Sequence, residues 1–367
     1  MKILFAIAHV SKGGGQSLQA FQLWRHLSER FETELLCLRA RDSSHRELEA
    51  EGVSSVGDLR FPAGVLDLAR AIRARRRSYH VLQAFDTYYA LPAARLAWHG
   101  PVCLRMGMDP ARDLGSRYGR GAEAAARAGL PFLLDGVHIV ANSPTLRDAF
   151  APWGAVFIPN GVDLERLQIS ESKEEARRVL GLPPDAPLLL FVGKVIPRKG
   201  LEDLLDALRS VDGARAVVVG HTSEENYGDR YYRHLLSEFR DVTGRVTFTG
   251  EVPFREIPLF LRSADVFVFP SRLEGSPNAV LEAMGAGLPV VAYDTPEHEA
   301  LIRSGENGFL YRDRRDLAAI LRDLLRDAGL RERVGAAGTR LVRERFSFVA
   351  AADSYARLYE SLAGKKR

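Results

Sequence analysis

Short apolar runs alternate with segments of helical periodicity in both halves of the chain. In the first half, residues 2–8 form an apolar run, and residues 16–29 place apolar side chains at helical spacing. In the second half, an apolar run at 188–192, a helical segment at 201–209 and a further apolar run at 214–219 repeat that order. Alternating strands and helices predict parallel sheets, so two such series predict two Rossmann-like α/β domains.

The boundary between these domains is expected near residue 169. Residues 169–187 are charged and then rich in proline, which is typical of a linker that carries a short helix. We therefore predict a first domain over 1–168 and a second over 169–347. A chain of 367 residues is long for a single core and long enough for two.

Another apolar run, at 264–270, is followed by residues that favour a helix start. The run is rich in β-branched and aromatic residues and predicts a buried parallel strand. Ser276 is a good N-cap and Pro277 suits the first helical position, so we expect the amides of Asn278 and Ala279 to be free. Free amides at a helix N-terminus favour an anion such as phosphate.

Two carboxylates flank this predicted helix start. Glu274 lies in the loop before it and Glu282 lies inside the helix, roughly 10 Å away at about 1.5 Å of rise per helical residue. Carboxylates accept hydrogen bonds from hydroxyls, so the spacing suits an elongated ligand with phosphate in the middle and hydroxyls at both ends. A nucleotide sugar fits that description. Taken singly, each glutamate is equally typical of a simple partner for the helix dipole.

Three basic residues follow the first strand of the second predicted domain. Lys194, Arg198 and Lys199 lie in the loop after 188–192, where positive side chains are placed to cover a diphosphate. Ordinary surface charge is the alternative interpretation. These residues add a second reason to expect a phosphate ligand.

A run of glycines follows the first strand of the first domain. Gly13, Gly14 and Gly15 would let the backbone approach a phosphate closely, although glycines in a turn need no ligand. The G-x-G-x-x-G register of dinucleotide-binding proteins is absent from this loop. A nicotinamide-dependent dehydrogenase is therefore disfavoured.

The net charge of +4 comes from the first half of the chain. Residues 1–168 hold 21 Lys and Arg against 17 Asp and Glu, while residues 169–367 hold 30 of each kind. Residues 70–127 alone hold 11 basic against 4 acidic side chains. Solvated helix faces explain such a region, and a patch for anionic lipid headgroups or an anionic acceptor is the alternative. The basic residues include Arg70, Arg73, Arg75, Arg76, Arg77, Arg112, Arg117, Arg120 and Arg127. Nucleic acid is not expected, because no nucleic-acid-binding module accompanies the charges.

Cysteine content and hydropathy narrow the class further. Cys37 and Cys103 are too few for a disulfide framework or a cysteine metal site. The apolar run at 3–10 is too short to span a bilayer, and no cleavage-type site follows it. We expect a cytoplasmic protein without a transmembrane segment.

Five segments, in order, resemble the retaining GT-B glycosyltransferases of glycosyltransferase family 4, also called group 1. The family signature is a Glu, seven residues and a second Glu, which matches Glu274 and Glu282 and continues through 283–292. The other matching segments are 13–16, 158–163, 191–200 and 306–310. Together the five segments span nearly the whole chain.

The resemblance implies a GT-B fold, in which two Rossmann-like domains with parallel sheets face an interdomain cleft that holds the site. It implies that residues 1–168 and a returning C-terminal helix, 348–367, bind the acceptor. It implies that residues 169–347 bind the nucleotide sugar. The reaction would retain the anomeric configuration and need no metal ion and no cofactor.

The resemblance also assigns roles to residues. Glu282 takes the ribose hydroxyls, and Glu274 holds the sugar and the β-phosphate. The residues that accompany Glu274 at the sugar and phosphate are Gly275, Ser276, Pro277, Asn278 and Ala279. The residues along which the nucleotide passes, or whose backbone reads the base, are Gly193, Gly220, Gly250, Glu251 and Val252.

Lys199 matches the basic position of the family pattern, whereas Lys194 stands where arginine is usual. Arginine and lysine are not interchangeable at a bidentate site, so diphosphate binding rests on Lys199 with Lys194 or Arg198 as an imperfect substitute. The leaving diphosphate gains negative charge in the transition state, and Lys199 would act where that charge develops.

One residue of the family pattern is missing. Many members carry a histidine after the fourth strand of the N-terminal domain, where residues 101–109 of this chain contain none. Arg105 and Asp109 are the candidate replacements. Other candidates, each more typical of a structural histidine, are His9, His138 and His298.

We therefore predict a retaining hexosyltransferase that moves a sugar from a UDP-sugar, or next a GDP-sugar, to a hydroxyl of a glycan or lipid-linked acceptor. Polysaccharide biosynthesis at the inner face of a membrane is the expected setting. The alternatives are a catalytically degenerate GT-B protein that binds nucleotide or glycan, and a sugar-nucleotide epimerase.

Overall fold

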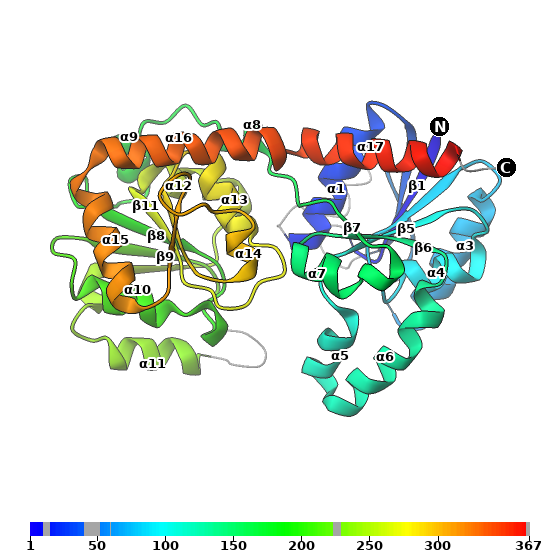
Figure 1. Ribbon diagram of the computed structural model, residues 1–367, viewed down its shortest axis with the longest axis horizontal. Coiled ribbons are helices and arrows are strands. Elements are labelled where there is room, and N and C mark those ends of the chain that lie inside the picture. Colours follow the sequence, from blue (N-terminus) through cyan, green and yellow to red (C-terminus); the bar gives the residue numbers. More distant parts are fainter. Residues whose placement is uncertain (10–14, 40–51, 59, 223–228, 365–367) are drawn as a thin grey trace. The chain divides into compact units, whose positions relative to one another are not determined.

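The computed structural model describes residues 1–9, 15–39, 52–58, 60–222 and 229–364. Contacts divide the chain into two compact units (Figure 1). The N-terminal unit comprises Met1–Gly161 and Phe348–Arg367, and the C-terminal unit comprises Val162–Ser347. Each unit is built on one parallel sheet, which confirms the predicted class of two parallel-sheet α/β domains.

The N-terminal unit holds a seven-stranded sheet in the order β3-β2-β1-β4-β5-β6-β7. In the inner strand β1, Ile3 pairs with Thr33 on one side and with Val81 on the other. Residues 3–6 are fully buried, as expected of a parallel strand covered on both faces. The strands are β1 Lys2–Ile7, β2 Glu32–Arg39, β3 Val53–Asp58, β4 Val81–Ala84, β5 Val102–Met106, β6 Val137–Ala141 and β7 Val156–Phe157.

The last helix of the chain belongs to this N-terminal unit. Tyr355 and Tyr359 of α17 are fully buried there, and the Tyr359 hydroxyl donates to Gln83 Oε1 at 2.8 Å. The helices of the unit are α1 Gly15–Ser28, α3 Ala63–Arg75, α4 Ala90–Ala97, α5 Pro110–Tyr118, α6 Arg120–Leu134, α7 Pro144–Ala149 and α17 Phe348–Gly364, with a 3-10 turn, η1, at Ala151–Trp153.

The C-terminal unit holds a six-stranded sheet in the order β10-β9-β8-β11-β12-β13. Its centre is apolar: Phe191 and Phe269, from neighbouring strands, stack with ring centroids 5.9 Å apart. The strands are β8 Leu188–Val192, β9 Arg215–Val219, β10 Val246–Gly250, β11 Val266–Phe269, β12 Val290–Tyr293 and β13 Phe309–Tyr311. The predicted strand at 188–192 is confirmed as β8, with the same bounds.

The helices of the C-terminal unit are α8 Leu164–Leu167, α9 Lys173–Val179, α10 Leu201–Leu208, α11 Arg230–Glu238, α12 Ile257–Ser263, α13 Asn278–Gly285, α14 Pro296–Glu299, α15 Arg314–Arg326 and α16 Ala328–Arg345. Three 3-10 turns are η2 Pro197–Lys199, η3 Thr243–Arg245 and η4 Phe254–Glu256. None of the helices in the described part of the chain combines the length and the hydropathy that a bilayer span requires.

The structure divides the units between Gly161 and Val162, earlier than the boundary expected near residue 169. The reason lies in α8, whose Leu164 and Leu167 approach Gly285 of α13 so closely that a Cβ there would lie 3.2 and 3.0 Å from their methyl groups. This packing attaches the start of the expected linker to the C-terminal unit.

Candidate functional site

Two loops that follow neighbouring strands of the C-terminal unit are bonded to one another. The loop after β8 ends at Gly200, and the loop after β11 begins at Pro270. The Arg272 N–H donates to the Arg198 carbonyl at 3.0 Å, and Arg198 Nη1 donates to the Leu273 carbonyl at 3.0 Å. Gly200 has a φ of 64°, and a Cβ there would lie 2.4 Å from the Pro270 carbonyl oxygen, so only glycine fits.

A buried ion pair joins the same two loops. Lys199 Nζ lies 2.5 Å from Glu274 Oε1, and the two side chains are only 11% and 10% exposed. Ser271 Oγ donates to the same carboxylate oxygen at 2.5 Å, and the ammonium lies 4.9 Å from the centre of the Phe269 ring. Burial lowers the pKa of Lys199, while the charge of Glu274 acts in the opposite direction. The ion pair therefore holds an ammonium in a site that would otherwise favour its neutral form.

The helix start after Glu274 differs from its predicted form. Ser276 was expected to cap the helix and Pro277 to begin it, but α13 begins at Asn278 and has no side-chain cap. Pro277 has φ −81° and ψ 75°, and the Asn278 N–H donates to the Ser276 carbonyl at 2.9 Å. This is an inverse γ-turn, in which the Asn278 amide is already bonded. The expectation of a free Asn278 amide was wrong; Gly275 and Ala279 lie on either side of this turn.

Glu282 of α13 forms a second ion pair, with Arg166 of α8, at 2.9 Å. Arg166 also lies over the Phe254 ring, 3.8 Å from its centre, and donates to the Phe254 carbonyl at 3.2 Å. Burial raises the pKa of the Glu282 carboxyl and Asp163 adds to that effect, while Arg166 opposes both. Sequence reasoning missed Arg166, because its contact with Glu282 joins two helices far apart in the chain.

Three predicted glycines meet where β8, β9 and β10 end. The Gly193 N–H donates to Val219, and the Gly220 N–H donates to Gly250 at 2.9 Å. A Cβ on Gly220 would lie 2.0 Å from the Gly193 carbonyl oxygen. Glu251 and Val252 follow directly, the first exposed and the second half-buried. Backbone therefore forms the surface at these three strand ends, beside the exposed side chain of Lys194.

Comparison with known proteins decides the family. Residues 172–341 match the family model described as "Glycosyl transferases group 1", and this segment lies inside the C-terminal unit. Residues 172–341 of the chain therefore carry the sequence features of this glycosyltransferase family. The Lys199–Glu274 and Arg166–Glu282 pairs thus lie in or next to the family's matched segment.

Two curated relatives show how far the sequence similarity extends along the chain. Phosphatidyl-myo-inositol mannosyltransferase of Mycobacterium leprae (strain TN) is 37% identical over 217 residues, which cover 57% of this chain and 54% of that protein. GDP-mannose-dependent alpha-(1-6)-phosphatidylinositol monomannoside mannosyltransferase of Mycobacterium tuberculosis (strain CDC 1551 / Oshkosh) is 28% identical over 303 residues, 76% of this chain and 77% of that one. The chain spans about half the length of the first of these relatives.

A solved structure shares the fold of this chain across its length. Anabaena Alr3699/HepE, crystallised with UDP and glucose, superposes with a TM-score of 0.79 at 21% identity, covering 98% of this chain and all of that chain. At this level of identity the likeness establishes the GT-B fold and nothing finer.

In the N-terminal unit, the predicted residues Arg105 and Asp109 are occupied by structural contacts. Arg105 of β5 is buried and donates to Asn160 Oδ1, while its buried Nη1 finds no hydrogen-bond partner among the described residues. Asp109 caps α5 by accepting from the Ala111 N–H at 2.9 Å, and it lies 3.3 Å from Arg127. Each residue has a structural partner. Gly13 and Gly14 lie outside the described residues, and Gly15 is the first residue of α1.

The histidine candidates do not converge. His298 belongs to the C-terminal unit, where it is fully buried, with its ring centroid 5.6 Å from that of Phe269 in a T-shaped contact. Its Nδ1 lies 2.6 Å from the Tyr293 carbonyl, and its Nε2 has no hydrogen-bond partner among the described residues. Burial lowers the pKa of His298. His9 and His138 are half-buried in the N-terminal unit.

Among the residues that the structure describes, no group of three His, Cys, Asp or Glu side chains is arranged to hold a metal ion. Cys37 and Cys103 are both buried thiols.

Proposed function

We propose that the protein is a retaining hexosyltransferase that moves a sugar from a nucleoside-diphosphate sugar to an acceptor hydroxyl. The observation that best supports this proposal is the buried Lys199–Glu274 ion pair at the ends of β8 and β11, followed by Glu282 on α13. Lys199 supplies a cation for the diphosphate, and Glu274 and Glu282 supply a carboxylate on each side of it for hydroxyl groups. The family of the chain supports the same reaction.

In the proposed reaction the bond between C1 of the sugar and the phosphate oxygen breaks, and a bond from C1 to the acceptor oxygen forms on the same face. The acceptor proton passes to the leaving phosphate. Lys199 is already fixed where negative charge grows on the diphosphate, so little reorganisation is needed during the step. When the diphosphate takes the ammonium, Glu274 becomes available to sugar hydroxyls. Glu282 is assigned to the ribose and does not act as an acid.

The nucleoside of the donor is proposed to be uridine first and guanosine second. The relatives support both, because one is named GDP-mannose-dependent and the superposed HepE structure contains UDP. The names of the mannosyltransferase relatives support a lipid-linked acceptor, with a glycan as the other class. We further propose peripheral contact with anionic membrane through 70–127, where Arg73, Arg77 and Arg120 are exposed. Flotation with phosphatidylglycerol vesicles, but not with phosphatidylcholine vesicles, is the expected result.

The test of the proposed reaction begins with thermal shifts for UDP, GDP, ADP and dTDP in EDTA. A nucleotide at 100 times its dissociation constant adds about 2.7 kcal/mol, or several degrees. We expect one nucleotide to shift the wild type, and Glu282→Ala to abolish that shift. Glu306→Ala is the matched control, because Glu306 is 70% exposed in another matching segment. A shift that needs added Mg²⁺ would overturn the metal-independent part of the proposal.

Product analysis separates the alternatives. A degenerate binding protein would show the thermal shift with UDP or GDP but release no free nucleotide from the sugar donor, even with acceptor. An epimerase would change the sugar of the donor without any acceptor. If no nucleotide shifts the wild type, donor binding at Glu274 and Glu282 is refuted.

A further inference from the structure

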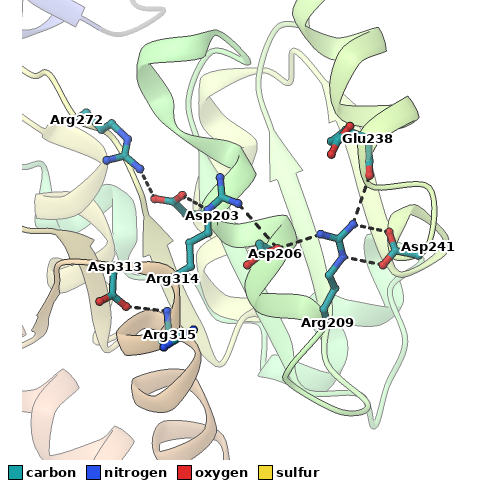
Figure 2. Close-up of polar contacts among 9 residues, drawn as sticks. All are labelled: Asp203, Asp206, Arg209, Glu238, Asp241, Arg272, Asp313, Arg314 and Arg315. Atoms are coloured by element: carbon teal, nitrogen blue, oxygen red, sulfur yellow. Dashed lines mark hydrogen bonds and ion pairs between the residues drawn. The ribbon is translucent and has the colours of Figure 1, made fainter.

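A buried aspartate on α10 joins three elements of the C-terminal unit (Figure 2). Asp203 is only 2% exposed, and its Oδ2 accepts from Arg272 Nη2 at 2.7 Å and from the Tyr311 hydroxyl at 3.0 Å. Its Oδ1 accepts from Arg314 Nε at 2.9 Å. Tyr311 ends β13 and Arg314 begins α15, whereas Arg272 lies in the loop that carries Glu274.

We infer that Asp203 is a positioning residue that acts through Arg272 on the loop carrying Glu274. This inference rests on the proposed function for its effect on nucleotide binding. Asp203 lies in the first turn of α10, directly after the loop that contains Lys199 and ends at Gly200. Lys199 and Glu274 thus lie in two segments that are joined a second time, by the contact between Asp203 and Arg272. One contact joins Lys199 to Glu274, and the other joins α10 to Arg272.

Arg272 is held by its backbone and its side chain together. Its N–H donates to the Arg198 carbonyl at 3.0 Å, and its guanidinium lies 4.3 Å from the centre of the Tyr293 ring. The side chain is 47% exposed, so without the carboxylate of Asp203 it is free to turn toward water. Glu274 follows two residues later, which makes the direction of its carboxylate dependent on how firmly Arg272 is held.

The other partners of Asp203 separate this role from simple stabilisation. Arg314 meets the same carboxylate and lies 3.9 Å from Asp206 of the same helix. Asp206, one turn further along α10, lies 3.0 Å from Arg209, and Figure 2 shows this contact on the side away from Arg272. Loss of the Arg314–Asp203 contact, or of the Asp206–Arg209 contact, removes an ion pair from α10 without changing a residue of the loop that carries Glu274. Arg314→Gln and Asp206→Asn are therefore matched controls.

The experiment compares Asp203→Asn, Arg272→Gln, the double variant and the two controls. Hydrogen–deuterium exchange at residues 271–274 is measured without nucleotide, and affinity is measured for UDP and GDP. We expect exchange of the loop amides to rise about tenfold in both single variants, and the affinity of the bound nucleotide to fall roughly threefold to tenfold. The double variant should be no worse than either single variant. Arg314→Gln and Asp206→Asn should stay within about twofold of the wild type.

Each of the other possible results decides whether Asp203 positions the loop or is only structural. If Asp203→Asn lowers the melting temperature but leaves loop exchange unchanged, Asp203 is only structural and the inference is overturned. If the losses of the single variants multiply in the double variant, Asp203 does not act through Arg272. Arg272→Gln keeps Asp203 paired with Arg314 and Tyr311, so it tests the loop even where Asp203→Asn folds poorly. If the wild type binds neither nucleotide, the proposed function fails, and loop exchange alone decides the role of Asp203.

Discussion

Charged side chains of the two units offer a comparison between two kinds of hydrogen-bond partner. In the C-terminal unit, Lys199 meets the carboxylate of Glu274, a charge opposite to its own. In the N-terminal unit, the carboxylate of Asp86 accepts from the backbone N–H groups of four residues, at 2.6 to 3.2 Å. The buried guanidinium of Arg105 likewise meets a neutral amide, that of Asn160. The first of these contacts pairs charge with charge, and the other two pair a charge with neutral dipoles.

This difference distinguishes residues that serve ligand binding from residues that serve folding. An ion pair between two side chains exchanges partners when a charged ligand arrives, because either side chain turns without unfolding the backbone. The amides around Asp86 are fixed parts of the chain that join the ends of β1 and β4 to the start of α4. Substitutions at Lys199 should therefore change ligand affinity, whereas substitutions at Asp86 should change the stability of the N-terminal unit.

The largest effect is expected for Asp86→Ala. Removing the carboxylate leaves four N–H groups without their acceptor, so the N-terminal unit should lose about 2–4 kcal/mol of unfolding free energy. Urea unfolding followed by tryptophan fluorescence measures this loss selectively. The three tryptophans, Trp24, Trp98 and Trp153, all belong to the N-terminal unit.

Asp148→Ala is the matched control for that measurement, because Asp148 is 65% exposed and pairs only at the surface with Arg147. It should change the unfolding free energy by less than about 0.5 kcal/mol. A loss for Asp86→Ala as small as that of the control would show that the four amides find water instead.

The next effect is expected for Lys199→Ala. The variant removes the cation proposed for the diphosphate and leaves Glu274 buried without its ammonium, so UDP or GDP affinity should fall roughly 10-fold to 100-fold. Isothermal titration calorimetry measures the affinity. The tryptophan transition should keep its midpoint, since Lys199 lies in the other unit. Affinity within threefold of the wild type would contradict the proposed role of Lys199.

The smallest effect is a pH dependence carried by His298. Burial lowers the pKa of His298 in the folded unit below the value of about 6.5 that it has in the unfolded chain. Below about pH 6.5 the unfolded chain therefore binds a proton that the folded unit does not, and stability falls as the pH falls. Between about pH 7 and pH 5.5 this group should cost up to about 1.4 kcal/mol.

Urea unfolding followed by circular dichroism at the two pH values measures that cost. His298→Gln should flatten this part of the pH dependence, and the exposed His234→Gln should not. An unchanged slope in His298→Gln would show that His298 takes up its proton in the folded unit.

Much of the fold could be predicted from periodicity alone, because strands buried on both faces are written as continuous apolar runs. The run at 188–192 became β8, and the run at 264–270 contains β11. The helix start after Glu274 could not be read in the same way. Pro277 is favourable both as a first helical residue and at the centre of an inverse γ-turn, and only the bond from Asn278 to Ser276 decides between them.

Contacts between distant segments account for the rest of what the sequence did not show. The family pattern identifies Glu274, Glu282 and Lys199, but it does not contain their partners in this chain. Arg166 reaches Glu282 only because α8 packs against α13. Asp203 is an ordinary charged residue of an amphipathic helix until three elements converge on it. The partners of Asp86 are backbone groups, and these have no sequence signature.

The position of α17 has a consequence for synthesis. The C-terminal unit is one continuous segment, Val162–Ser347, so a ribosome completes it before it makes α17. The N-terminal unit is begun first, but Tyr355 and Tyr359, which fill its core, are translated last. The half of the protein that is made first must therefore wait for the other half to be synthesised before its core closes, which reverses the usual order of domain folding during translation.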